Sequence, residues 1–274
     1  KGGYIRLSDF VGADQQAPRA LEALADPNCP WRYQSLADDF DALPGSPISY
    51  WASKSIRQSF KTMKTVGDFS KPHIGMQTGD NERFLRFWWE ASFDHIFMDC
   101  DSEEESFASP KKWYPCNKGG SFRRWYGNQD YVVDWQNDGR VIVGDAEKEK
   151  RKFMNLPPEY KFKPNVAWSM LSSSCAAFRY FPAGFIFEHA ASGMVGDETI
   201  LMSILGFCNS EVAKAMLALV SPTLNFNVSS IAQLPMNPEK NDVVAEIARE
   251  NVTLTKSDWD SFEESWNFEK HPLV

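Results

Sequence analysis

The stretch from Lys111 to Asn128 carries five basic residues, five aromatic residues and no acidic residue. Lysine and arginine neutralise phosphates, arginine can bond guanine edges through two N–H groups, and aromatic rings stack on bases. The stretch therefore predicts a face that contacts nucleic acid, although the same composition also fits a solvated basic loop over a layer of aromatic core residues. The basic residues of this stretch are Lys111, Lys112, Lys118, Arg123 and Arg124.

A second candidate is the glycine-framed segment Gly75–Phe84. Its glycines permit close approach by another backbone, and Gln77, Thr78 and Asn81 present short polar side chains. We predict these three residues as secondary contacts to the same partner. A purely structural turn is the alternative interpretation of this segment.

Residues suited to catalysis are sparse. Glu188 and His189 follow an apolar run and offer a general base, because histidine titrates near neutrality, but no nucleophile is identifiable beside them. The motifs of hydrolase elbows, phosphate loops, dinucleotide sites and zincins are absent from the sequence. Leu156-Pro157-Pro158-Glu159 lacks the polar side chain and the ring with which an Asp/Asn-Pro-Pro-Tyr motif holds a flipped base. We expect no catalytic residue here; a nuclease or hydrolase with a dispersed site is the enzyme alternative.

The composition limits the classes of function. The chain has 274 residues, 29 basic and 37 acidic, and a net charge of −8, so any contact with nucleic acid is expected to be local. Five cysteines without a C-x-x-C pair predict a reducing cytoplasm, and four scattered histidines give a zinc site little support. No stretch approaches the roughly 20 apolar residues of a membrane span and no signal peptide is visible. We therefore expect a cytoplasmic protein that contacts no membrane.

The elements that must position these residues follow from the apolar spacing. Short apolar or alternating runs from Val66 onwards, separated by turn residues, predict a twisted sheet. Apolar residues that recur at three- and four-residue steps from Ile200 to Leu219 predict one long helix, whose buried stripe includes Ile204 and Leu205. The predicted fold class is thus α+β, β-rich with a long packing helix. Strands are expected at residues 131–135, 141–143, 166–171, 178–181, 184–188 and 231–236, with a hairpin at Asp138-Gly139 between the first two.

The segments before and after the predicted sheet and helix have other residue patterns. The first 65 residues are mixed and turn-rich, with helical spacing at residues 17–25 and 55–64. A last helix is expected to begin at Val243. The acidic end carries aromatic residues at three-to-four-residue spacing from Trp259 to Phe268, which predicts a short amphipathic helix that needs a partner surface.

Several motifs, in a fixed order along nearly the whole chain, resemble a known family. The Gly75–Phe84 segment, Ile204–Ser210 and Ile231–Met236 resemble the target recognition domain of DNA restriction-modification systems. Four further motifs look like the carboxy-terminal half of the adenine-specific DNA methyltransferases of BREX phage-defence systems, the PglX family. These are Tyr4–Phe10, Gly45–Trp51, Asn117–Gly127 and Asp258–Glu263.

The resemblance implies a division of the chain and a function. Residues 1–65 would be a connector toward a methyltransferase domain, residues 66–236 a DNA target recognition domain, and residues 237–274 a helical tail. The chain would read a short sequence in double-stranded DNA while that separate domain flips and methylates adenine with S-adenosylmethionine, a cofactor not held by this chain. Other defence proteins are possible partners by the same resemblance. The binding alternative is a protein-interaction domain that docks other defence components or a phage-encoded DNA mimic, consistent with the net charge of −8.

Overall fold

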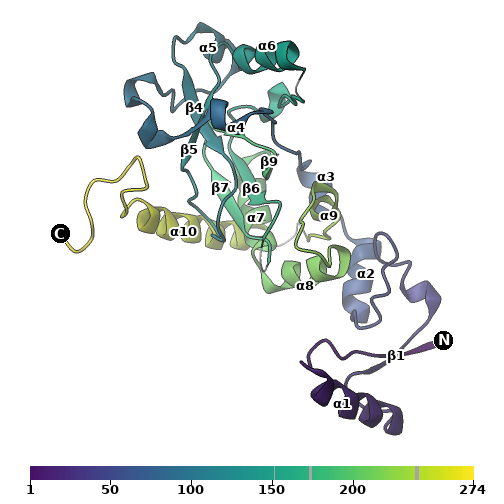
Figure 1. Ribbon diagram of the computed structural model, residues 1–274. Coiled ribbons are helices and arrows are strands. Elements are labelled where there is room, and N and C mark those ends of the chain that lie inside the picture. The colour runs from purple at the N-terminus through teal and green to yellow at the C-terminus, as the bar shows by residue number, and fades with distance from the viewer. Residues whose placement is uncertain (151, 173–174, 238–240) are drawn as a thin grey trace.

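The computed structural model of the chain describes residues 1–150, 152–172, 175–237 and 241–274. The predicted α+β class is confirmed: helices pack on three small sheets. Figure 1 shows the N-terminal segment at one end of the molecule, the sheet with β4 and β5 at the other, and the sheet with β6, β7 and β9 between them.

The N-terminal segment builds a small unit of its own. Strands β1 (Gly2–Ile5) and β2 (Arg32–Ser35) pair antiparallel, and α1 (Ala13–Ala25) connects them. A 3-10 turn follows at Ala37–Asp39, and then α2 (Lys54–Thr62) begins with Ser53 as its N-cap. The two helices predicted for this segment are confirmed. The side chains of α2 meet Leu219 in a small apolar cluster, which links this unit to the rest of the chain.

One larger sheet has the order β3-β5-β4-β8. Its core contains large buried side chains such as Tyr114, Trp135 and Phe162. Its strands are β3 (Leu85–Phe87), β4 (Trp113–Asn117), β5 (Tyr131–Asp134) and β8 (Ile186–Phe187), and its helices are α4 (Asn81–Phe84), α5 (Glu103–Ala108) and α6 (Arg140–Glu149). Single 3-10 turns lie at Trp88–Glu90, Phe93–His95 and Pro158–Tyr160.

The other large sheet has the order β7-β6-β9 and is covered by helices. Helix α7 packs between this sheet and α10, and the two helices approach closely because Gly206 has no side chain: a Cβ there would lie 2.6 Å from a Val244 methyl carbon. The strands are β6 (Asn165–Ser169), β7 (Phe178–Phe181) and β9 (Ala191–Val195). The helices are α3 (Val66–Phe69), α7 (Glu198–Cys208), α8 (Glu211–Val220), α9 (Val228–Ala232) and α10 (Asn241–Trp259).

The predicted single long helix is wrong in one respect. Ile204 and Leu205 are fully buried as predicted, but the helix breaks after Cys208 into α7 and α8, which are bent by 74°. Asn209 leaves the helix to exchange two side-chain hydrogen bonds with the main chain of Phe178, and Ser210 caps α8. Among the described residues no single helix is long and apolar enough to cross a membrane; α7 and α8 meet that test only as this bent pair.

Two predicted strands are wrong. Residues 141–143 belong to α6, because Asn137, Asp138 and Gly139 all adopt positive φ and start a helix instead of a hairpin. The segment 231–236 begins inside α9, and its second half only bridges Thr65 through Pro235. The other predicted strands are present, although β8 is short.

The C-terminal prediction is partly wrong. A helix does start near Val243, but α10 runs on to Trp259, and the residues that follow form turns where a short amphipathic helix was predicted. The predicted partner surface lies on the chain itself. Trp266 packs against Phe185 and Trp88, whose indole N–H donates to the carbonyl of Glu264.

Candidate nucleic-acid interface

The five basic residues of the Lys111–Asn128 stretch do not form one patch. Lys111 and Lys112 precede β4; Lys111 donates to the carbonyl of Asp94, and Lys112 lies 3.5 Å from a carboxylate oxygen of Asp134. Lys118 follows the other end of the same strand. At about 3.3 Å per residue, Lys112 and Lys118 are separated by about 20 Å. The structure therefore divides the predicted cluster into two groups.

The loop that follows β4 folds back over β6 and β7. Asn117 accepts a hydrogen bond from the Gly119 N–H at 3.0 Å, and Gly119 and the next glycine take positive φ, which glycine adopts without strain. The hydroxyl of Ser169 donates to the Gly120 carbonyl. Trp125 then pairs with the main chain of β7, with N–O distances of 2.8 and 2.7 Å. These contacts place the middle of the loop beside β7 and the end of β6 from which the chain crosses to β7.

Arg123 joins this loop to the last helix. Its guanidinium carbon lies 4.8 Å from the centroid of the Trp259 ring, and one terminal nitrogen lies 3.8 Å from Asp258. Gly127 makes room for it, because a Cβ there would be 2.4 Å from the Arg123 Cδ. The side chain is 34% exposed, so part of the cation still faces solvent.

Lys118 borders a hollow of about 290 Å³ at the end of β4. Its amino group lies 4.8 Å from the centroid of the Tyr131 ring, and both polar and apolar residues line the hollow beside it. One of them is His189, whose main-chain N–H donates to the carbonyl of Met76. The remaining lining residues are Gly120, Ser169, Met170, Leu171, Ala190 and Asn225.

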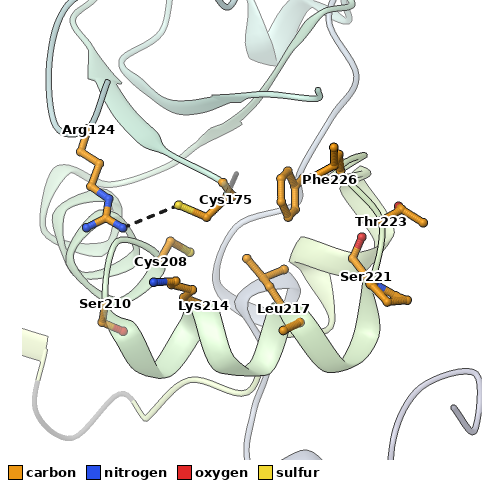
Figure 2. A pocket seen from close by; sticks show the side chains of 13 residues that line it. Arg124, Cys175, Cys208, Ser210, Lys214, Leu217, Ser221, Thr223 and Phe226 are labelled. Atoms are coloured by element: carbon orange, nitrogen blue, oxygen red, sulfur yellow. Dashed lines mark hydrogen bonds between the residues drawn. The ribbon is translucent and has the colours of Figure 1, made fainter. Parts of the chain in front are cut away.

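Arg124 points into a second hollow, of about 270 Å³, above α8 (Figure 2). The guanidinium of Arg124, 4.0 Å from the Cys175 sulfur, lies at the same end of the hollow as Lys214, while Leu217 and Phe226 line the other end. Its Nε is buried with no acceptor among the described residues. Lys214 also lies 3.1 Å from a carboxylate oxygen of Glu211, so Arg124 provides the positive charge at this end. The hollow is therefore cationic at one end and apolar at the other, which suits a ligand with an anionic group and a flat apolar body.

A third hollow, of about 130 Å³, contains a residue that the sequence analysis did not single out, Arg179 of β7. The sequence signal was present: an arginine at the centre of the aromatic strand Phe178–Phe181 is unusual for a buried run. The other lining residues are Gly120, Ser121, Phe122, Ser169, Leu171, Ser172 and Ala177.

The three hollows adjoin one another, and together we call them the cationic edge. Gly120, Ser169 and Leu171 line both the Lys118 hollow and the Arg179 hollow. The N–H of Ser172, in the Arg179 hollow, donates to the carbonyl of Leu224, which lines the hollow of Figure 2. No acidic residue is among the described residues that line them. The cations of the edge are Lys118, Arg124, Arg179 and Lys214.

The second candidate segment, Gly75–Phe84, makes contacts within the fold. The Thr78 hydroxyl donates to Asn81 at 2.5 Å, and the Asn81 amide lies 3.5 Å from Glu188. Glu188 is buried and also accepts the N–H of Ala190 at 2.8 Å. The half-buried Gln77 pairs its main chain with Met154 and does not line the cationic edge. The close approach that this segment's first glycine permits is thus to the chain itself, since a Cβ there would lie 2.3 Å from the Glu188 carbonyl.

The structure brings no metal-ligating cluster to the remaining catalytic candidates, Glu188 and His189, among the described residues. Glu188 and His189 are neighbours in sequence, but the Glu188 carboxylate is engaged with Asn81 and Ala190, while His189 borders the Lys118 hollow. In the part of the chain that the structure describes, no group of three or more His, Cys, Asp or Glu side chains is placed to hold a metal ion.

The sequence is similar along its whole length to two adenine-specific methyltransferases. It is 34% identical over 278 residues, covering 100% of this chain, to the adenine-specific methyltransferase PglX of Lacticaseibacillus casei (strain Zhang). It is 32% identical over 275 residues, covering 99% of this chain, to the adenine-specific methyltransferase BrxX of Escherichia coli O9:H4 (strain HS). The chain spans 23% and 21% of the lengths of these relatives, in their carboxy-terminal part.

No model of a known protein family matches the sequence. Among solved structures, the Type IIL restriction-modification enzyme MmeI in complex with DNA matches with a TM-score of 0.49 and 11% sequence identity. That match covers 76% of this chain and 30% of the MmeI chain.

Proposed function

Because the chain belongs to the family of the adenine-specific methyltransferases PglX and BrxX, and matches their carboxy-terminal part, we propose that it recognises double-stranded DNA for such an enzyme. The family resemblance of the sequence motifs is confirmed by these relatives. In this proposal the module works in a phage-defence system of the BREX type, and residues 66–236 form its target recognition domain.

The observation that carries the proposal is the cationic edge. Of the four cations that line it, Lys214 lies 3.1 Å from a carboxylate oxygen of Glu211, whereas Lys118, Arg124 and Arg179 have no carboxylate within salt-bridge distance among the described residues. In a chain with a net charge of −8, this surface is a local region of positive potential. Small polar side chains, such as those of Ser121 and Ser169, line the same hollows as these cations. Such a surface can hold phosphates through its cations while arginine reads base edges.

The proposed contacts follow the two groups of basic residues. Lys118 and Arg124 open into hollows of the cationic edge and are the primary contacts; Arg123, stacked on Trp259, supports the same loop and contacts phosphate through its exposed part. Lys111 and Lys112 form a separate, secondary contact further along the duplex. Gln77, Thr78 and Asn81 remain proposed secondary contacts, although Thr78 and Asn81 are already bonded within the fold.

Methyl transfer belongs, in this proposal, to the part of the relatives that the chain does not span. We assign S-adenosylmethionine to that part, since this sequence offers no Asp/Asn-Pro-Pro-Tyr motif to hold a flipped adenine. The connector of residues 1–65 would dock on that catalytic domain through the apolar side chains that α1 leaves exposed, Leu21 and Leu24. The chain alone, incubated with duplex DNA and labelled S-adenosylmethionine, should incorporate no label above a no-protein control.

The direct test is duplex binding at several salt concentrations. If three to five phosphates are neutralised, the logarithm of the association constant should fall with the logarithm of salt with a slope of about −3 to −5. The double variant Lys118→Ala, Arg124→Ala should reduce that slope by about 2. The matched control is Arg140→Ala, Lys148→Ala, which removes one lysine and one arginine from the exposed face of α6.

The same titration ranks the two basic groups. The variant Lys111→Ala, Lys112→Ala should weaken binding less than the Lys118, Arg124 variant does. Using the parent's target duplex and a scrambled duplex separates readout from phosphate contact, because loss of a base contact also relaxes sequence preference. Equal effects of the cationic-edge variant and the α6 control would reject this surface as the DNA site.

A further inference from the structure

Arg179 is an unusual cation for a protein core. It is 1% exposed, at the centre of β7, opposite Ala167 of β6. Its two acceptors among the described residues are neutral: the Arg123 carbonyl at 3.1 Å and the Ser169 hydroxyl at 3.1 Å. Its Nε is buried with no acceptor in the described part of the chain. A buried guanidinium has five N–H groups to satisfy, and these bonds leave several of them unused.

The charges around Arg179 do not compensate it. Burial, reinforced by the neighbouring charge of Arg123, lowers the pKa of Arg179 to about 10, and the smaller effect of Asp130 opposes this. Burial likewise raises the pKa of Asp130, so this carboxylate is itself poorly solvated. Since an isolated buried charge costs several kcal/mol, a cation kept at this position without a bonded carboxylate calls for an anion from outside the chain.

The hollow beside Arg179 has the chemistry of an anion site. Three hydroxyl side chains, Ser121, Ser169 and Ser172, line it together with Gly120. The hydroxyls of Ser169 and Ser172 donate to the carbonyls of Gly120 and Cys175, so Ser121 supplies the hydroxyl donor for a ligand. Gly120 takes a φ of +112°, and its carbonyl is turned to the Ser169 hydroxyl, which in turn accepts from Arg179. The volume of about 130 Å³ admits a phosphate group and excludes a nucleobase with its sugar.

We propose that the Arg179 hollow binds one backbone phosphodiester of the DNA strand, held by the Arg179 guanidinium and the Ser121 hydroxyl under the loop after β4. This inference rests on the proposed DNA-recognition function and adds a buried anchor to its exposed contacts. Arginine binds phosphate through two parallel N–H groups, and in a buried site these bonds are stronger than on the surface. A fixed phosphate would set the register of the duplex along the cationic edge, so that Lys118 and Arg124 meet defined positions.

The first experiment measures anion binding without DNA, on the full chain. Thermal unfolding is followed with inorganic phosphate and with chloride at equal ionic strength. Phosphate should raise the melting temperature of the wild type above that in chloride, and this difference should be lost in Arg179→Met and kept in Arg140→Met, the same change on the exposed surface of α6. Should Arg179→Met fold poorly, Arg179→Lys keeps the charge without the two-pronged geometry and should bind phosphate more weakly than the wild type.

The second experiment locates the phosphate in DNA. Target duplexes with a single neutral methylphosphonate at successive positions are titrated with the wild type, Arg179→Met and Arg140→Met. One position should weaken wild-type binding by about 10- to 100-fold, as expected for one charge-assisted contact. The same substitution should have no added effect on Arg179→Met, whose salt slope should be lower by about 1.

The outcomes separate this inference from the proposed function. If the wild type binds duplex but every methylphosphonate affects wild type and Arg179→Met equally, and phosphate does not stabilise the protein, the Arg179 site is rejected while DNA recognition stands. If no duplex binds but phosphate stabilises the wild type through Arg179, the hollow takes free phosphate and both the DNA source and the proposed function are rejected.

Discussion

Two buried cations, one in each large sheet region, are treated in opposite ways. Lys161, packed under the β3-β5-β4-β8 sheet, is 2% exposed and lies 2.6 Å from a carboxylate oxygen of Asp138, while it also bonds Glu103. Its amino group lies 5.7 Å from the centroid of the Trp135 ring, whose N–H donates to the same Asp138. Arg179 in the other sheet is as deeply buried but bonds only neutral groups among the described residues.

The difference separates a structural cation from a binding one. Lys161 lies between two carboxylates and ties α5 to the turn before α6, so its charge is consumed inside the fold. Arg179 borders a hollow and has an N–H group with no acceptor in the described part of the chain, so its charge is available to a ligand. Burial alone therefore does not identify a functional cation; its acceptors do.

The largest expected effect is the loss of Lys161. Lys161→Met leaves Asp138 and Glu103 without their cation, and removing one partner of a buried ion pair typically costs about 3 to 5 kcal/mol of unfolding free energy. Urea unfolding measures it. A loss below about 1 kcal/mol would show that this pair behaves like an exposed one and would remove the contrast with Arg179.

The region around Arg179 should depend on apolar packing. Leu205 is fully buried on α7. Leu205→Ala should lower the free energy of unfolding by about 2 to 5 kcal/mol, because apolar burial is lost and a cavity remains. Val212→Ala, at a position 57% exposed on α8, is the control and should stay within about 0.5 kcal/mol. Equal destabilisation by the two variants would contradict the observed burial of the helix stripe.

Replacing Arg179 itself should change stability little. Arg179→Met loses two hydrogen bonds to neutral acceptors, each worth about 1 kcal/mol, but it also removes the cost of burying an unpaired charge. We expect any loss of unfolding free energy to stay within about 1 kcal/mol by the same urea measurement, far below that of Lys161→Met. A loss of about 3 kcal/mol or more would make Arg179 a structural cation like Lys161.

The smallest effect concerns Asp130. Burial raises its pKa, whereas Arg123 and Arg179 lower it, so Arg179→Met should raise the pKa of Asp130 further. A carboxyl with a folded pKa above its unfolded value binds protons more tightly in the folded state, so its contribution to stability falls as pH rises from about 4 through the folded pKa. In the variant this fall should extend to higher pH. Carboxyl NMR titration of Asp130 checks it, and an unchanged titration would mean that Arg179 is too distant to act on Asp130.

Local signals in the sequence were enough for part of the fold. Helices at α1 and α2 and strands at β5, β6 and β7 were predicted because capping, turn and apolar spacing act within a few residues. The break between α7 and α8 was missed because both helices pack on one core, so the apolar repeat continues across Asn209, whose amide bonds are made to a distant strand. The strand at residues 141–143 failed similarly, since the positive φ of Gly139 suits a hairpin and a helix start alike.

The candidate site shows the same division. Residue composition identified the basic and aromatic stretch, and the order of several motifs identified the family. Both signals depend only on residue types and their order along the chain. Only the tertiary structure decided that Lys112 and Lys118 lie at opposite ends of a strand, that Arg124 and Lys214 share a hollow, and that Arg179 is buried beside one. Which cations act together is set by how a loop folds back over a hairpin far away in sequence, and pairwise spacing along the chain carries no record of that contact.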